Sequence, residues 1–291
     1  MTISYSLADF NKALSSLPND CTTGFVPTMG ALHQGHISLV KQALTKTSTV
    51  VVSVFVNPTQ FNNPNDLAKY PRSVEEDCRL LEEAGASIVF VPSVEDIYPA
   101  PDTRTFDLGG LDQTGEGPKR PGHFNGVAQV VTRLFDIVKP KYAFFGEKDF
   151  QQLAIIRHFT KELGYPVQIV ACPTLREADG LAMSSRNLLL TSQHRAAAPA
   201  IYKALSEAGE RAAQILHNGS SKKNINITPQ ELIQQATASI EKGGLLKVEY
   251  IEIVNSVNLK LISNWDEADG IQMCAAVYAG EVRLIDNIKL K

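Results

Sequence analysis

The chain has 291 residues, of which 44% are hydrophobic and 20% are charged, and its formal net charge at pH 7 is −3. That length is enough for two domains with a substantial core. The nearly neutral balance contains no basic block, which argues against nucleic acid as a partner, because duplex binding usually needs a basic face. No apolar run reaches membrane-spanning length and the first ten residues lack a signal-peptide pattern, so we expect no membrane partner.

Strand and helix patterns alternate over residues 1–175. Residues 22–28 indicate a strand, and apolar residues then recur at helical spacing over 37–44. Residues 50–56 are almost all β-branched, as expected of a parallel strand covered on both faces. Residues 73–76 have the pattern of a capping box that opens a helix ending at Gly85. Further strands are predicted over 87–91, 142–145 and 167–171, and further helices over 127–138 and 151–163.

This alternation predicts βαβ units in a Rossmann-like, doubly wound parallel sheet. After residue 175 the pattern changes. Helices are predicted over 193–216 and 229–242, with a polar loop over 217–224 between them. A strand over 248–254 is followed by two strands, 273–279 and 282–285, that flank a hairpin turn at Gly280 and Glu281. The sequence therefore predicts a first domain over 1–175 and a smaller α+β domain over 176–291.

The segment 27–36 (PTMGALHQGH) lies where a predicted strand passes into a helix. It places two histidines three residues apart, with glycines on either side. Such a turn presents backbone N–H groups and the positive end of a helix dipole to an anion. The imidazoles can then donate hydrogen bonds to phosphate oxygens. The pattern is typical of a site that binds a nucleoside triphosphate and cleaves it at the α-phosphate.

Four further polar motifs fit the same chemistry, although each one alone also fits an ordinary turn. The side-chain amides within residues 57–61 (NPTQF) can form hydrogen bonds with hydroxyl and carboxylate groups. Residues 120–126 (RPGHFNG) contain an arginine, a histidine and two glycines. The lysine of 146–149 (GEKD) can pair with a phosphate, and 183–186 (MSSR) supplies hydroxyls and an arginine for outer phosphates. Three of the five motifs, 27–36, 57–61 and 146–149, directly follow predicted strands, where ligands bind on such sheets.

Several other classes are disfavoured. The chain contains neither a P-loop motif nor a nucleophile elbow, so it is neither a P-loop protein nor a typical α/β-hydrolase. The four cysteines form no C-x-x-C pair, so we expect reduced thiols, a cytoplasmic location, and neither a zinc site nor a disulfide framework. These residues are Cys21, Cys78, Cys172 and Cys274.

Together, the motifs resemble those of the pantoate–β-alanine ligase (pantothenate synthetase) family. The resemblance runs in order through residues 25–190 and is carried by 27–33 with 35–36, 57–61, 70–72 (YPR), 120–124, 146–149 with 151–152, and 179–187 (DGLAMSSRN). The histidine-containing turn also resembles the HIGH signature of class I adenylate-forming enzymes, and 183–186 resembles their mobile KMSKS loop. Gln34 and Leu189 depart from the family pattern, which more often has an acidic and an aromatic residue there.

The resemblance implies an ATP-dependent ligase that condenses (R)-pantoate with β-alanine through a pantoyl adenylate, releasing pyrophosphate and AMP. ATP is then a substrate. Mg²⁺ is expected to be coordinated mainly by the ATP phosphates, without a dedicated set of protein ligands. The family further implies a homodimer. Residues 1–175 would bind ATP and pantoate, and residues 176–291 would form a lid over the site.

The resemblance also assigns roles to residues. His33, His36 and Lys148 are implied as catalytic: both histidines donate to phosphate oxygens, His36 is the proton donor to the leaving group, and Lys148 holds the α-phosphate. Gln60 and Gln152 would bind pantoate, with Gln60 also beside the β-alanine amine. Gly146 and Asp149 would contact the ribose, Leu175 the adenine, and Ser184, Ser185 and Arg186 the outer phosphates. The whole implied ATP site consists of Met29, Gly30, Ala31, Leu32, His33, Gln34, Gly35, His36, Gly146, Glu147, Lys148, Asp149, Leu175, Met183, Ser184, Ser185 and Arg186.

Two other functions stay open at this point. A nucleotidyltransferase of the same superfamily would keep the nucleotidyl group in its product, whereas a ligase releases AMP. A non-catalytic ATP-binding sensor would bind ATP without pantoate-dependent pyrophosphate exchange. An aminoacyl-tRNA synthetase fragment is disfavoured by the acidic balance and by the lack of an anticodon-type domain.

Overall fold

The computed structural model describes residues 1–18, 20–61, 67–68, 70–217 and 227–291. The chain forms two compact units. The first comprises Met1–Gly109, Arg120–Glu147 and Gln152–Leu175, and the second comprises Gly110–Lys119, Lys148–Gln151 and Arg176–Lys291. Two short segments that precede residue 175 therefore belong to the second unit. The lid role of residues 176–291 stays a prediction, and the loop predicted over 217–224 lies outside the described residues except for His217.

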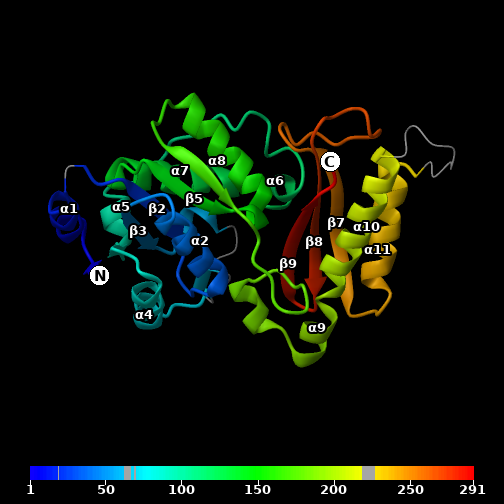
Figure 1. The fold of residues 1–291 in the computed structure, drawn as a ribbon, viewed down its shortest axis with the longest axis horizontal. Helices are drawn as coiled ribbons and strands as arrows, with labels where there is room; N and C mark the ends of the chain where they lie inside the picture. The colour runs from blue at the N-terminus through cyan, green and yellow to red at the C-terminus, as the bar shows by residue number, and fades with distance from the viewer. Residues whose placement is uncertain (19, 62–66, 69, 218–226) are drawn as a thin grey trace. The chain divides into compact units, whose positions relative to one another are not determined.

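A six-stranded parallel sheet forms the centre of the first unit (Figure 1). Its strand order is β1-β4-β3-β2-β5-β6, which confirms the doubly wound sheet predicted from the sequence. From β2 the chain adds strands first on one side and then, from β5, on the other, so the switch point lies between β2 and β5. The strands are β1 (Thr2–Ser4), β2 (Thr23–Thr28), β3 (Thr49–Val54), β4 (Ile88–Phe90), β5 (Tyr142–Gly146) and β6 (Gln168–Cys172).

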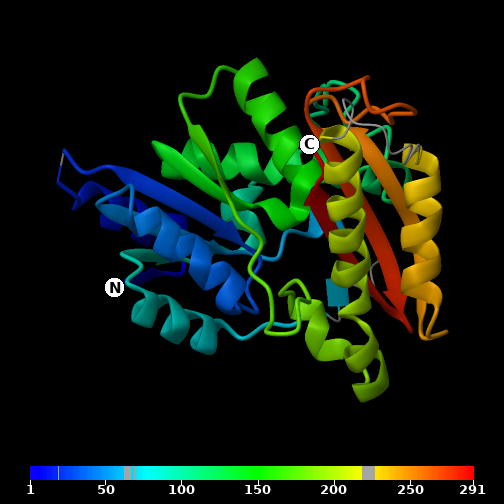
Figure 2. The ribbon, with the colours of Figure 1, turned by 45° about the vertical axis from the view of Figure 1, so that its right-hand side comes forward.

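Helices cover both faces of this sheet. Successive strand residues point to opposite faces, and Phe25 and Val26 of β2 are both fully buried. Helices α2 and α4 lie on one side of the sheet, and α7 and α8 lie on the other (Figures 1 and 2). The helices of this unit are α1 (Leu7–Ser15), α2 (Gln34–Leu44), α4 (Val74–Ala84), α5 (Val94–Ile97), α7 (His123–Val138) and α8, which the structure starts at Phe150 and ends at Glu162.

The predicted capping box at the start of α4 is wrong. Ser73 is the residue before the helix, but its ψ of 57° departs from the extended backbone of a capping serine, and its side chain accepts no helical N–H. Its hydroxyl instead donates to Oδ1 of Asp77 at 3.3 Å. The other end of the helix is as predicted, because Gly85 adopts the left-handed conformation with φ of 89°. Strand β1 and helix α1 were not predicted.

The second unit packs helices on an antiparallel sheet. The strands are β7 (Leu246–Asn255), β8 (Ile271–Ala279) and β9 (Val282–Lys289), in the order β7-β8-β9. Gly280, with φ of 62°, sits in the predicted two-residue turn between β8 and β9. The helices are α6 (Glu116–Lys119), α9 (Ser192–Ala197), α10 (Ala200–His217) and α11 (Pro229–Glu241). The single helix predicted over 193–216 is wrong, because Pro199 lacks an N–H and separates α9 from α10.

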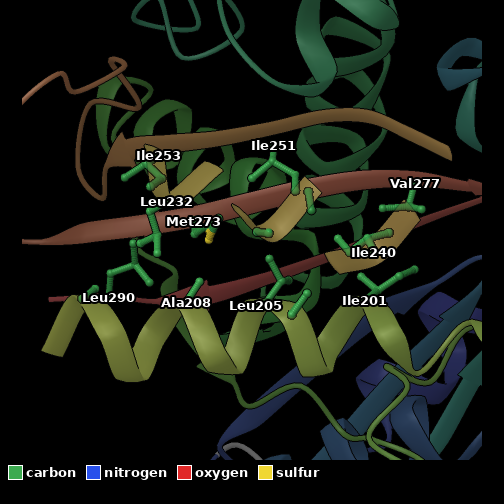
Figure 3. Packing of buried hydrophobic residues seen from close by; sticks show 14 of the residues in the cluster. Ile201, Leu205, Ala208, Leu232, Ile240, Ile251, Ile253, Met273, Val277 and Leu290 are labelled. Atoms are coloured by element: carbon green, nitrogen blue, oxygen red, sulfur yellow. The ribbon is translucent and has the colours of Figure 1, made fainter. Parts of the chain in front are cut away.

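The core of the second unit lies between its sheet and helices α10 and α11. Figure 3 shows Ile201, Leu205 and Ala208 of α10 pointing toward the strands, where Ile253 and Met273 project from β7 and β8. All of these side chains are buried. The predicted α+β character of this part of the chain is therefore confirmed. Among the described residues, no helix combines the length and the hydropathy that crossing a membrane requires.

Candidate functional site

The turn between β2 and α2 carries the first predicted motif. Strand β2 ends at Thr28, beside the switch point of the sheet, and α2 begins at Gln34. Two consecutive residues of the turn are left-handed: φ is 81° at Gly30 and 50° at Ala31. A Cβ on Gly30 would lie 2.9 Å from a carboxylate oxygen of Asp77, so glycine is required by space as well as by conformation.

A buried carboxylate holds this turn in place. Asp77 of α4 accepts hydrogen bonds from the backbone N–H groups of Ala31 at 3.0 Å and Leu32 at 2.7 Å. Burial raises the pKa of Asp77 above its ordinary value, while these N–H groups and the Ser73 hydroxyl act to lower it. The sequence interpretation missed Asp77. Its only local signal is an acidic residue in the first turn of a helix, which is common.

Both histidines of the turn bind backbone N–H groups through Nδ1. The Nδ1 of His33 accepts from the N–H of Gly35 at 3.1 Å, and the Nδ1 of His36 accepts from the N–H of His33 at 3.3 Å. The ring centroids are 4.1 Å apart. A ring nitrogen that accepts an N–H bears no proton, so each neutral imidazole carries its proton on Nε2. The backbone thereby selects the tautomer that donates from Nε2, which is the one a phosphate-binding imidazole needs.

The motif at 57–61 is joined to this turn by a buried glutamine. Residues Pro58–Gln60 form the short helix η1 after β3. The Nε2 of Gln60 donates to Sδ of Met29 at 2.8 Å, and its Oε1 accepts from Nδ2 of Asn57 at 3.2 Å. Asn57 is 1% exposed, and its Oδ1 accepts from the Tyr98 hydroxyl at 2.9 Å. Tyr98 is a second residue that the sequence interpretation missed.

The motif at 120–126 packs onto the same short helix. The Nδ1 of the buried His123 lies 2.8 Å from the backbone oxygen of Gln60, and Nδ2 of Asn57 donates to the backbone oxygen of Gly126 at 3.2 Å. A Cβ on Gly126 would lie 2.4 Å from the backbone oxygen of Thr59, so only glycine allows α7 to approach η1 this closely. Three motifs that are distant in the sequence therefore meet within the first unit.

Other predicted residues of the first unit lie at the ends of β5 and β6 or on α8. Gly146 ends β5, and a Cβ added there would have no atom within 4 Å. Opposite Gly146 on β6, burial and the nearby Glu147 raise the pKa of Cys172 to about 11, so this thiol is no nucleophile at neutral pH. Gln152 is half-buried in the first turn of α8. In the part of the chain that the structure describes, Gln152 forms no hydrogen bond with Gln60 or Met29.

Lys148 and the serine-rich motif belong to the second unit. Lys148 lies on the short helix η2 (Glu147–Asp149), with Nζ 4.0 Å from Oδ1 of Asp149. Its backbone oxygen accepts from Nδ2 of Asn287 at 2.9 Å. Ser184 caps the short helix η3 (Ser185–Leu189), and its Oγ accepts from the N–H of Arg186 at 3.3 Å. The predicted residues thus form two groups, one in each unit.

The described residues contain no group of three or more His, Cys, Asp or Glu side chains that could hold a metal ion. The hydrogen-bond donors among the predicted residues are imidazole, ammonium, guanidinium, hydroxyl and amide groups. Such a donor set suits an anionic ligand.

Comparison with known proteins places this arrangement in a family. A family model described as pantoate-beta-alanine ligase matches residues 2–289. The pantothenate synthetase of Porphyromonas gingivalis is 53% identical over 268 residues, which cover 92% of this chain and 91% of that protein.

Two solved structures are similar over the whole chain. The pantothenate synthetase from Thermus thermophilus has a TM-score of 0.89 and 40% identity, with 100% of this chain and 99% of that chain covered. The pantoate-beta-alanine ligase from Francisella tularensis, solved in complex with beta-gamma ATP and β-alanine, has a TM-score of 0.75 and 35% identity, with 100% and 98% covered.

The role of Asp77 can be tested without an activity assay. In Asp77→Ala the N–H groups of Ala31 and Leu32 lose their acceptor. We expect amide hydrogen exchange in residues 29–36 to accelerate about fivefold, since one hydrogen bond contributes about 1 kcal/mol. Mass spectrometry of peptides from the exchanged protein measures this. The control is Glu76→Ala on the same helix, whose exposed pair with Arg79 should leave exchange unchanged. Equal exchange in both variants would show that the carboxylate does not hold the turn.

Proposed function

The chain belongs to the pantoate–β-alanine ligase family, and we propose how its residues divide the work of that family's reaction. The enzyme condenses pantoate with β-alanine using ATP. The pantoate carboxylate attacks the α-phosphorus of ATP, which forms pantoyl adenylate and releases pyrophosphate. The β-alanine amine then attacks the acyl carbonyl and expels AMP. The observation that carries our assignment is the histidine pair at the start of α2, fixed by the backbone as donors from Nε2.

The triphosphate is proposed to bind at the N-terminus of α2. The positive end of the helix dipole favours an anion there, and the Nε2–H groups of His33 and His36 supply hydrogen bonds. Gly30 gives the nucleotide close access to the backbone of residues 29–36. We assign His36 as the proton donor to the leaving pyrophosphate. Since no protein nucleophile takes part, the rate depends on alignment and on neutralising the charge that develops during transfer.

We propose the following contacts for the rest of the nucleotide. Lys148 holds the α-phosphate, where an ammonium offsets the charge of the transition state. Gly146, Glu147 and Asp149 lie along the ribose, and Leu175, 39% exposed, packs on the adenine. The outer phosphates are held by the segment that contains Met183, Ser184, Ser185 and Arg186.

Pantoate is proposed to bind to the amides of Gln60 and Gln152. The Nε2 of Gln60 carries two hydrogens, and Met29 takes one of them. We propose that the second donates to pantoate. Asn57 holds the Gln60 carbonyl oxygen at 3.2 Å, so the amide is fixed in this orientation. The β-alanine amine would lie beside the same side chain when it attacks the adenylate.

Three further properties are proposals. Mg²⁺ is proposed to arrive on the triphosphate, since ATP-bound Mg²⁺ needs few protein ligands and would neutralise phosphate charge. A cytoplasmic location fits the four free cysteines. The homodimer implied by the sequence resemblance is to be checked by sedimentation.

The proposal predicts a partial reaction. With pantoate present and β-alanine absent, the enzyme should exchange labelled pyrophosphate into ATP, because adenylate formation is reversible. Omitting pantoate should abolish the exchange, and adding β-alanine should release AMP. Retention of the nucleotidyl group in the product would indicate a nucleotidyltransferase. Binding of ATP with no exchange would indicate a sensor.

Lys148→Ala should slow adenylate formation about 100- to 1000-fold, because a donor to transferring charge is lost. Single-turnover measurement with saturating ATP and pantoate reports this step alone. Lys161→Ala, which changes an exposed lysine of α8, serves as the control and should keep the wild-type rate. A nearly normal single-turnover rate in Lys148→Ala would refute its role.

His36→Ala should impair only the first half of the reaction. Adenylate formation should slow because the leaving pyrophosphate loses its proton donor, by about 100-fold for one acid catalyst. Isolated pantoyl adenylate should still react with β-alanine at the wild-type rate. If both half-reactions fell while ATP affinity stayed intact, His36 would not be the donor.

A further inference from the structure

Two adjacent residues of β9 bind two segments that carry, or lead to, residues of the proposed nucleotide site. Asp286 is 5% exposed and Asn287 is 8% exposed. Neither residue was singled out by the sequence motifs. They lie on a strand that pairs with β8 through its whole length, with Asp286 opposite Ala275 and Asn287 opposite Cys274. The strand therefore gives both side chains a rigid base.

Asn287 holds the backbone of the turn that carries Lys148. Its Nδ2 donates to the backbone oxygen of Lys148 at 2.9 Å. Its Oδ1 accepts from Nε2 of Gln272 at 2.7 Å, which fixes the orientation of the amide. Its own N–H donates to Oδ1 of Asp286 at 2.8 Å, so the two β9 side chains are linked.

Asp286 holds the start of the segment that leads to Ser184, Ser185 and Arg186. Its carboxylate pairs with Arg176 through two hydrogen bonds, of 2.7 Å and 3.0 Å. The same guanidinium donates to the backbone oxygen of Gly180 at 3.2 Å and lies 3.6 Å from the ring centre of Tyr202. The backbone of Arg176 also forms an antiparallel β-bridge with the backbone of Ala182. This bridge closes a short hairpin directly before Met183. Bidentate pairing fixes the direction as well as the position of the guanidinium.

We propose that Asp286 and Asn287 are positioning residues of the ligation reaction. One dipeptide of β9 holds the Lys148 turn and the Arg176 hairpin in a fixed register, so that the ammonium and the serine-rich segment meet one nucleotide together. The inference rests on the proposed function, because it assigns catalytic use to Lys148. Displacing a catalytic group by about 1 Å can lower a rate about 100-fold, which is enough for such anchors to matter.

A double-mutant cycle separates positioning from simple stabilisation. The rate of adenylate formation is measured in single turnover for the wild type, Asn287→Ala, Lys148→Ala and the double variant. If Asn287 acts through Lys148, Asn287→Ala should slow the step about 10- to 100-fold alone but less than about threefold in the Lys148→Ala background. If Asn287 only stabilises the fold, its effects should multiply with those of Lys148→Ala, and the inference fails.

The second arm concerns Asp286. Asp286→Asn keeps the shape of the side chain but removes the charge that pairs with Arg176. We expect it to slow the same step about tenfold, with much less effect in an Arg186→Ala background, if it positions the serine-rich segment. If the effects of Asp286→Asn and Arg186→Ala on this rate were fully independent, Asp286 would not be a positioning residue.

Controls keep each outcome interpretable. Trp265→Phe removes another side-chain hydrogen bond to a backbone oxygen in the same unit, the 2.8 Å bond to Ile227, and should keep the wild-type rate. Asn287→Leu has a similar side-chain volume, adds no charge and lacks the Nδ2 donor, so it replaces Asn287→Ala if that variant unfolds. A wild-type enzyme without pantoate-dependent exchange would overturn the proposed function itself. Normal exchange in the wild type together with a normal rate in both Asn287 variants would overturn only the positioning role.

Discussion

The hydrogen bonds between the Asp77 carboxylate and the N–H groups of Ala31 and Leu32 are the constraint on which the first group of site residues depends. Ala31 has a Cβ and a φ of 50°, a backbone conformation that is costly without compensating contacts. The charged hydrogen bonds supply that compensation. Once the turn is set, the N–H groups of Gly35 and His33 reach the two imidazoles, and the tautomer of both rings follows. A carboxylate on α4 therefore determines, through backbone alone, which nitrogen of each histidine can donate.

In both units, hydrogen bonds from neighbouring side chains fix the position of the proposed site residues. In the first, the side-chain amide of Asn57 donates a hydrogen bond to the side-chain amide of Gln60. Gly126 lets α7 come close enough for its backbone oxygen to accept a second bond from Asn57. In the second, Asn287 holds the backbone of Lys148, and Asp286 holds Arg176. A reaction without a protein nucleophile needs donors placed accurately around charge that moves from the α-phosphate to pyrophosphate. The residues that hold these donors lie on the first turn of α4 and on strand β9, rather than on loops, and this provides that accuracy.

Local sequence signals predicted the elements that local physics determines. The β-branched run of β3, the glycine that ends α4 and the turn at Gly280 all appear where the sequence placed them. The capping box failed because the Ser73 hydroxyl found Asp77 instead of the helix backbone. The anchors escaped notice for a different reason. Asp77 binds residues 45 and 46 positions away, and Asn287 binds a residue 139 positions away. Such partners become neighbours only when the sheets assemble, so no spacing along the chain records them.

Stability gives little reason to place Asp286 and Arg176 where they are. Moving a carboxylate and a guanidinium out of water costs several kcal/mol per ion, and a well-packed apolar pair in their place is often as stable or more stable. Asp286 is buried, yet its two bonds to Arg176 fix a hairpin by direction, which an apolar contact does not do. The adjacent Asn287 donates a hydrogen bond to the backbone oxygen of Lys148, and the bond from Gln272 fixes the orientation of the Asn287 amide. Directional contacts at a net cost in desolvation are what a site needs when it must hold two segments in register around one triphosphate, and this is why we assign the pair to the reaction rather than to the fold.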